Sequence, residues 1–409
     1  MTEAVAQLQQ GLSLLASVPD SPWRLRQELE LLLALGRALF AAKGWAAPAV
    51  GETYARAGIL AEQLDRSDCL IPLLCGRWAF HLVRSELRLA LSLAERIERI
   101  GKAQDDIAPR LLGHLGHGVT RFHLGEFAAA RALLEQCHGL NDPAHRAVCA
   151  AVMAEDPHAR MLAYLAWTLT YLGYIDQGRS RIHDALTEAR RLRHAYPLGL
   201  LLALAAVIES ATGSPHEAKQ RAEETVALAN EHGFPLHLAL GNVHLGGALT
   251  ALGQASKGLT LITDGLAMYR ATGAVLHTPW MLIRVAEAHV RLGQPIEGLE
   301  CFAEAAQVIE TTDERREEAE LHRVRGDLLN ATGDRAAAEQ CYHQALAVAR
   351  RQNAKLFELR AATSLARLWR DQGKRREARD LLAPVYGWFT EGFDTPVLKD
   401  AKASLDQLA

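Results

Sequence analysis

The chain has 409 residues, of which 49% are hydrophobic, and it carries a formal net charge of −3. That charge argues against a nucleic-acid partner, and no apolar run reaches the roughly 18 residues of a membrane span. The N-terminal segment has no basic region and the six cysteines have no metal-like spacing, so we expect a cytoplasmic protein with reduced cysteines. Along the chain, residues 1–20 are predicted to form a partial leading helix.

A turn that contains glycine then recurs along the chain. From Gly173 to Gly373 these glycines stand 40 residues apart five times in succession, and Gly125 precedes Gly173 by 48 residues. Counting back in steps of 40 and 41 places Ser85 and Gly44 at the same point of two earlier units. The sequence therefore contains nine repeats, one of which carries an insertion of eight residues.

A small residue follows each of these turns at a fixed distance. Small residues let two antiparallel helices approach closely, and glycine supplies the left-handed backbone that ends the first helix. Each repeat is thus predicted to be a helix, a tight turn and a second helix. The nine residues that stand five positions after the turn are Ala49, Ala90, Ala130, Gly178, Ala218, Gly258, Gly298, Ala338 and Ala378.

The repeat "ELHRVRGDLLNATGDRAAAEQCYHQALAVARRQ" shows both apolar stripes and places an aromatic residue, Tyr342, on the second helix. It resembles the tetratricopeptide repeat, although the period is 40 rather than about 34 residues. The resemblance implies an all-α, right-handed superhelical solenoid of about nine hairpins, in which the first helices line the concave face. We therefore predict a single solenoid domain over residues 1–409, with the hairpins in residues 21–385.

Residues 386–409 are predicted to cap the solenoid, because the last repeat of a stack leaves an apolar face without a neighbour. Thr395 is a suitable N-cap, and Pro396 suits the first position of a helix. Trp388, Phe389 and Phe393 are expected to fill the seam beneath that helix. A docking peptide is the alternative.

The stretch "ELRAATSLARLWRDQGKRREARDLLAPVYG" and the residues after it resemble the C-terminal end of a large bacterial family. In that family a cyclase or DNA-binding domain and a STAND-type ATPase precede tetratricopeptide-like repeats. The resemblance implies a sensor or regulatory region for such an ATPase or adenylate cyclase. It also implies that Met1 begins a fragment or a protein that has lost its upstream domains.

The chain lacks the catalytic motifs of that family. There is no phosphate-binding G-x-x-x-x-G-K-[ST] loop, no glycine-rich dinucleotide loop and no nucleophile elbow. His114 and His117 are one helical turn apart, but no acidic or cysteine partner is near on that helix. We therefore predict a non-enzymatic binding module with no catalytic residues, no metal and no cofactor.

The concave lining is predicted from positions two, three, six and ten residues before each turn. In repeats three to six these positions are apolar and aromatic, and the expected binding residues are Phe122, His123, Trp167, Tyr171, Val207 and Val243. In repeats seven to nine they are charged, with Glu287, Arg291, Arg323, Asp327, Arg367 and Arg370. Such a groove suits a protein or peptide partner, including the upstream ATPase or cyclase domain, or an amphipathic small ligand. The alternative is that the superhelix curls tightly and its lining packs against itself.

The insertion spans residues 138–160 and contains two Asp-Pro turns. Loops on a regular scaffold often carry function, so the segment is a candidate flap over the aromatic part of the groove. A longer solvated connection is the alternative. A small-molecule receptor or enzyme, with a pocket built by repeats three to six and this segment, is the second functional hypothesis. The candidate binding residues in the segment are His145, Arg146, Asp156, His158 and Arg160.

Overall fold

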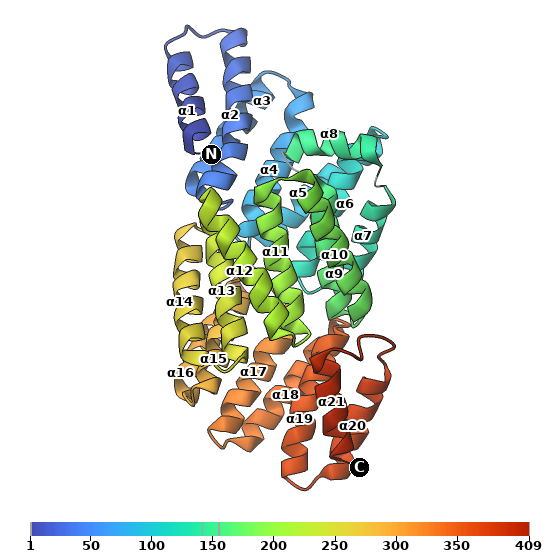
Figure 1. Cartoon of the computed structure of the whole chain (residues 1–409). Helices are drawn as coiled ribbons and strands as arrows, with labels where there is room; N and C mark the ends of the chain where they lie inside the picture. Colours follow the sequence, from blue (N-terminus) through green and yellow to red (C-terminus); the bar gives the residue numbers. More distant parts are fainter. Residues whose placement is uncertain (1, 141, 154–155, 409) are drawn as a thin grey trace.

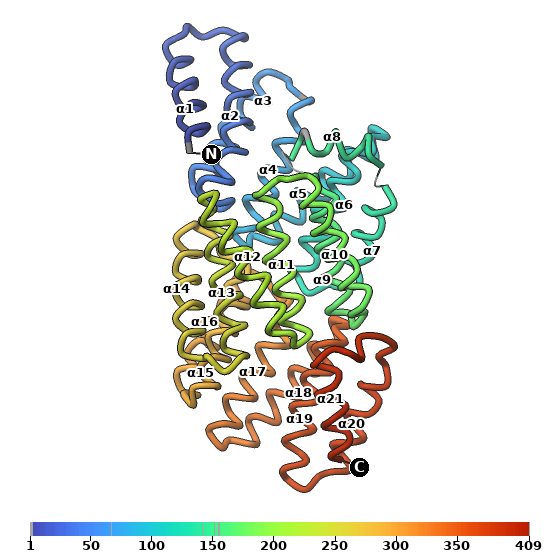
Figure 2. The backbone as a smooth tube through the Cα atoms, in the orientation of Figure 1, coloured from blue at the N-terminus to red at the C-terminus, as the bar shows by residue number. Residues whose placement is uncertain are grey.

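The computed structural model describes residues 2–140, 142–153 and 156–408. Over these residues the chain forms 21 α-helices, one short 3-10 helix at Ser67–Cys69 and no strand. Figures 1 and 2 show an elongated stack that runs from the N-terminal helices at one end to the C-terminal helices at the other. None of these helices combines the length and the apolar character needed to cross a bilayer. The prediction of an all-α repeat fold is confirmed.

Eighteen of the helices in the described residues pair into nine antiparallel hairpins, as the repeat count predicts. The first helices of the hairpins are α2 (Pro22–Lys43), α4 (Leu70–Val83), α6 (Ile107–His123), α9 (Pro157–Tyr171), α11 (Ala195–Ala211), α13 (Pro235–Ala251), α15 (Thr278–Arg291), α17 (Glu318–Ala331) and α19 (Lys355–Asp371). The second helices are α3 (Pro48–Gln63), α5 (Leu87–Ala103), α7 (Phe127–Gly139), α10 (Ile175–Leu192), α12 (Pro215–His232), α14 (Ala255–Ala271), α16 (Pro295–Thr312), α18 (Arg335–Arg351) and α20 (Arg375–Gly387). The other three are α1 (Thr2–Ala16), α8 (Pro143–Met153) and α21 (Pro396–Asp406).

In eight of the nine hairpins the turn is a left-handed helix cap. At the third repeat the N–H of Gly125 donates to the carbonyl of Phe122 (3.0 Å), and the N–H of Glu126 donates to that of Arg121 (3.0 Å). These two bonds satisfy the last carbonyls of α6 and require a positive φ at Gly125, which is +78°. All nine predicted turn residues have a positive φ, including Ser85 at +58°. Gly44 differs, since its N–H donates to Phe40 and its ψ is 157°.

The small residues after the turns are needed for helix contact. A Cβ on Gly258 would lie 2.1 Å from the hydroxyl oxygen of Thr250 and 2.5 Å from the carbonyl oxygen of Gly246. Any side chain there would push α14 away from α13. The fixed small position in the sequence therefore reports close packing inside a hairpin, as predicted.

The insertion differs from both interpretations of the sequence. Its central part folds into an extra helix, α8, which packs against α4 and α6. Cys149 is fully buried at this contact, and its thiol lies 3.7 Å from the carbonyl oxygen of Ala108. The described part of the segment is therefore a packed helix, and forms neither a flap over a groove nor a solvated connection.

Successive turns of the superhelix touch each other. The backbone N–H groups of Val275 and Leu276 donate to the carbonyl of Val83, each at 3.0 Å, and that of Arg315 donates to His123 at 3.0 Å. The partners stand 192 or 193 residues apart, which is about five repeats. Connections between late repeats therefore dock on the turns of early ones, and the superhelix closes on itself here.

The C-terminal segment caps the stack and also reaches back across it. Helix α21 packs on α19 and α20 and buries Leu398 and Ala401 completely. Its first N–H, that of Val397, is bonded to the carbonyl of Thr212 at 3.2 Å, five repeats earlier. Phe389 is buried as predicted, whereas Trp388 and Phe393 are 37% and 47% exposed.

Candidate functional site

The aromatic residues predicted to line the groove form a closed interior instead. Phe122, His123, Trp167 and Tyr171 are each at most 1% exposed. The ring centroids of Phe122 and Trp167 are 4.6 Å apart, and those of Trp167 and Tyr171 are 5.9 Å apart. In repeats three and four the lining therefore packs against itself. These four side chains have no surface to offer a ligand, so we assign them no binding role.

The two predicted residues of repeats five and six are also buried. Val243 has no exposed surface and belongs to the core of α13. Val207 is 5% exposed and borders a cavity of about 10 Å³ that also touches Tyr171 and Trp280. That volume is about one water molecule. Neither Val207 nor Val243 therefore borders a space that could hold a small molecule.

Of the five candidates in the insertion, Arg146, Asp156 and His158 link α8, α9 and α10. Arg146 pairs with Asp156 and with Glu188 of α10, while the backbone N–H of His158 donates to Asp156 (2.9 Å). His145 is half-buried on α8. Arg160 is buried, and its guanidinium lies 4.8 Å from the ring centroid of Trp45. The segment joins neighbouring hairpins, away from the open cavity described below.

A buried charged cluster stabilises the closure of the superhelix. Arg316 lies in the connection between α16 and α17 and has no exposed surface. Its Nε donates a hydrogen bond to Glu314 (3.2 Å), and its Nη2 donates one to Nδ1 of His277 (2.8 Å). Its guanidinium stacks on Trp167 at 4.6 Å. On its other side, the Tyr171 hydroxyl donates to Glu317 at 2.6 Å. We call Arg316, Glu314, Glu317 and His277 the clasp.

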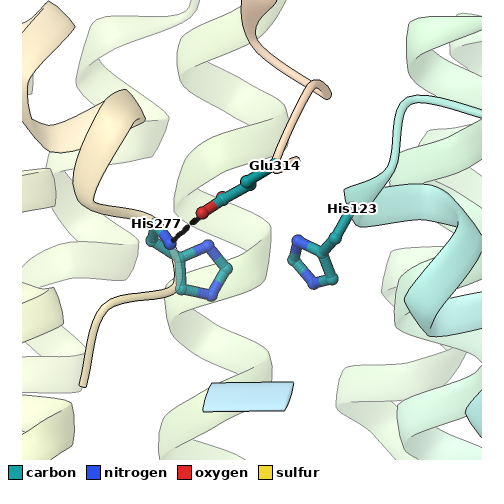
Figure 3. Close-up of side chains that lie close together, drawn as sticks. All are labelled: His123, His277 and Glu314. Atoms are coloured by element: carbon teal, nitrogen blue, oxygen red, sulfur yellow. Dashed lines mark hydrogen bonds between the residues drawn. The ribbon is translucent and has the colours of Figure 1, made fainter. Parts of the chain in front are cut away.

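His123, His277 and Glu314 come close enough together to suggest a metal site. Their ligand atoms lie within 4.8 Å of one another. Figure 3 shows the two imidazoles beneath the carboxylate of Glu314, which accepts a hydrogen bond from the backbone N–H of His277. These three side chains nevertheless suit a metal poorly, because two of them are already bonded to Arg316. The guanidinium of Arg316 already neutralises Glu314 and occupies Nδ1 of His277, so metal ligation by the other ring nitrogen would need an imidazolate.

Burial and the Arg316 cation hold the pKa values of His123 and His277 well below the usual range. Both rings are therefore neutral around pH 7. Burial also raises the pKa of Glu314, which the adjacent guanidinium opposes. Arg316 thus serves as the cation of this cluster.

An open cavity lies on the concave side of the later repeats. Its volume is about 930 Å³, and residues from Ser210 to Asp400 line it. The walls come from α11, α13, α15, α17 and α19, with α21 closing one end. This is near the upper end of the ~300–1,000 Å³ range of ligand sites. The cavity is therefore our candidate site.

One wall of the cavity is a network of ion pairs between the first helices of repeats seven to nine. Glu287 lies 2.8 Å from Arg284 and 3.1 Å from Arg323, and Glu320 lies 3.0 Å from Arg323 and 2.9 Å from Arg360. Burial alone would raise the pKa of Glu320, but the two guanidiniums lower it to about 2. The carboxylate of Glu320 is therefore ionised at neutral pH, and its ion pairs hold the side chains of Arg323 and Arg360 in place.

A residue of α18 fixes one end of this network. Arg323 also pairs with Asp327 (2.6 Å), whose other oxygen accepts from the Tyr342 hydroxyl (2.7 Å). Tyr342 is the aromatic residue expected on the second helix of the repeat. It therefore holds the charged wall against α18.

A second wall of the cavity is small and apolar. It is built by α11 and α13, where Ala211, Gly247, Ala248 and Ala251 line the cavity. A Cβ placed on Gly247 would meet only the Cδ of Arg284, at 3.8 Å. The space above this helix is therefore open, and the cavity has one apolar and one charged side.

The rule for the concave lining holds for most of the charged residues predicted in this half of the chain; Arg370 is the exception, because it does not line the cavity. Glu287, Arg291, Arg323, Asp327 and Arg367 were all predicted at lining positions, and all line the cavity. The sequence missed Arg284 and Arg360, which stand outside those four positions, and it missed the clasp. A signal for the clasp was available in "DERREE", a charged run in a connection that the repeat places against other helices.

Comparison with known proteins agrees with this fold. Residues 277–351 match the tetratricopeptide repeat model. The fold is a tetratricopeptide-like solenoid. A search of curated protein sequences found no match.

Several solved structures share this solenoid fold. The crystal structure of Rap protein complexed with competence and sporulation factor has a TM-score of 0.61 at 11% identity, covering 94% of this chain and 100% of that one. NprR in complex with its cognate peptide NprX has a TM-score of 0.58 at 14% identity, covering 89% and 98%. The APC/C hetero-tetramer Cut9–Hcn1 has a TM-score of 0.54 at 16% identity, covering 88% and 59%. At these identities the likeness shows the fold.

Proposed function

We propose that the chain is a non-enzymatic sensor module that binds a peptide or protein segment in the cavity of repeats five to nine. The observation that carries this proposal is the cavity itself, with its volume of about 930 Å³ and its contrasting walls. A fixed charged side orients polar groups, and an open apolar side accepts side chains, which together suit an extended peptide.

Two further observations support the proposal. The described cavity lining offers arginines and carboxylates that pair with each other, and no nucleophile activated by an adjacent base. NprR, whose solenoid resembles this one, was solved with its cognate peptide. From the sequence resemblance we further propose that the module regulates a bacterial signalling ATPase or adenylate cyclase.

The test is a selection of peptides from a displayed random heptapeptide library on the whole chain. Peptides enriched on the natural sequence should lose at least roughly tenfold in affinity for Gly247→Trp, because the indole extends into the cavity. The open space around Gly247 lets the helix accept that change.

Gly58→Trp is the matched control. Gly58 lies in α3, has nothing within 4 Å of an added Cβ, and is far from the cavity lining. Peptides should bind this variant as they bind the natural chain. A selection that yields no peptide sensitive to Gly247→Trp would contradict the proposed function.

A further inference from the structure

The charges around the cavity do not balance. Among the lining residues, six are basic and four are acidic: Arg284, Arg291, Arg323, Arg360, Arg367 and Lys399 against Glu287, Asp327, Asp371 and Asp400. Glu320, beneath the wall, joins the paired network. The cavity lining therefore carries a surplus of positive charge, and the position of that charge determines which ligands it can attract.

Two cations of the lining have no ion-pair partner within the described residues. These are Arg291, at the end of α15, and Lys399, on α21, and both are exposed. By contrast, Arg367 pairs with Asp400, and Arg323 and Arg360 share Glu320. The surplus positive charge therefore belongs to Arg291 and Lys399, on helices that border the same space.

A third donor lies deeper in the cavity. The side chain of Arg284 is only 10% exposed, and its Nε has no hydrogen-bond partner among the described residues. Burying a donor without an acceptor is unfavourable, so an acceptor brought by a ligand would be favoured there. Arg284 also adjoins the apolar wall, because its Cδ would lie 3.8 Å from a Cβ placed on Gly247.

We propose that the occupant is an acidic peptide segment, whose carboxylates meet Arg291 and Lys399 and whose small apolar side chains pack on α11 and α13. A carbonyl or carboxylate oxygen of the segment accepts from Nε of Arg284. This inference rests on the proposed function and adds the chemistry of the ligand to it.

The acidic residues of the lining favour a peptide over a nucleic acid. Glu287, Asp327, Asp371 and Asp400 border the same cavity, and a phosphate at every nucleotide would bring negative charge close to them. A peptide carries its carboxylates at separate positions. It can place them against the two unpaired cations and place uncharged residues near the acids.

The experiment compares the peptides selected above on charge variants. The enriched heptapeptides should contain Asp or Glu together with Ala, Val or Leu, and should carry a net negative charge. The double variant Arg291→Glu/Lys399→Glu should weaken their binding by roughly tenfold or more, since it replaces two attractions by repulsions. Raising the ionic strength from about 0.05 M to about 0.5 M should weaken binding to the natural chain as well.

The matched control is Arg335→Glu/Lys257→Glu, which changes the net charge equally on α18 and α14, outside the cavity lining. It should bind as the natural chain does. Two results would overturn this inference and leave the proposed function standing. In the first, the peptides depend on Gly247 but show no preference for acidic residues. In the second, they bind both double variants equally well. Displacement of the peptides by a labelled single-stranded oligonucleotide would also overturn it.

Discussion

Replacing Arg316 by methionine should lower the free energy of unfolding by about 3–5 kcal/mol at neutral pH. The substitution keeps an apolar chain of similar length against Trp167 but removes the only cation bonded to Glu314 among the described residues. Glu314 and Glu317 are 1% and 3% exposed, so their carboxylates would stay buried without compensation. Denaturant unfolding followed by circular dichroism measures the loss.

The loss should shrink on acidification. Burial already raises the pKa values of Glu314 and Glu317 above their ordinary value of 4.5, and removing Arg316 raises them further. A carboxyl group whose pKa is higher in the folded chain than in the unfolded chain stabilises the fold more as the pH falls through its folded value. The difference between Arg316→Met and the natural chain should therefore narrow from pH 8 toward about pH 5.

The control for Arg316→Met is the same substitution at Arg376, whose side chain is 92% exposed. It should change stability by no more than about 0.5 kcal/mol. Adding Glu314→Gln and Glu317→Gln to Arg316→Met should restore most of the loss. If Arg316→Met is as stable as Arg376→Met, the clasp does not close the superhelix.

Trp167→Ala should cost about 3–5 kcal/mol of stability. Trp167 is 1% exposed and lies among Phe122, Tyr171 and the guanidinium of Arg316, so its removal leaves a cavity between two turns of the superhelix. Trp23→Ala is the matched control, because Trp23 is 59% exposed on α2. The two variants are compared by urea unfolding.

The same two variants also test the sequence-based binding prediction. Trp167→Ala, where it still folds, should bind the selected peptides as the natural chain does. Equal stability of Trp167→Ala and Trp23→Ala would contradict the closed interior. If Trp167→Ala folds but no longer binds the peptides, the binding site lies in repeats three and four.

The hairpins could be predicted because their signals are local. A left-handed turn needs glycine or a residue that tolerates positive φ, and close helix contact needs a small side chain such as Gly258. Both requirements recur in every hairpin, so spacing alone revealed them. Segment 138–160 has no counterpart in the other repeats, and its helix α8 was not predicted.

The site was harder to predict because residues at the same position of the repeat are buried in some repeats and line the open cavity in others. Six residues before the turn, Trp167 fills the interior of repeat four, whereas Gly247 and Glu287 line the open cavity of repeats six and seven. Which outcome holds depends on the superhelical pitch, set by contacts about five repeats apart such as that between Arg315 and His123. A periodic pattern contains no information about such contacts.

The most direct test of the binding site is photo-crosslinking with a selected peptide that carries a photoreactive group, mapped by mass spectrometry on the whole chain. The cavity of repeats five to nine predicts crosslinks to α13, α15, α17 and α19, lost when Gly247 is replaced by tryptophan and retained in Gly58→Trp. Crosslinks that fall instead on α6, α8 or α9, or that persist in Gly247→Trp, would contradict it.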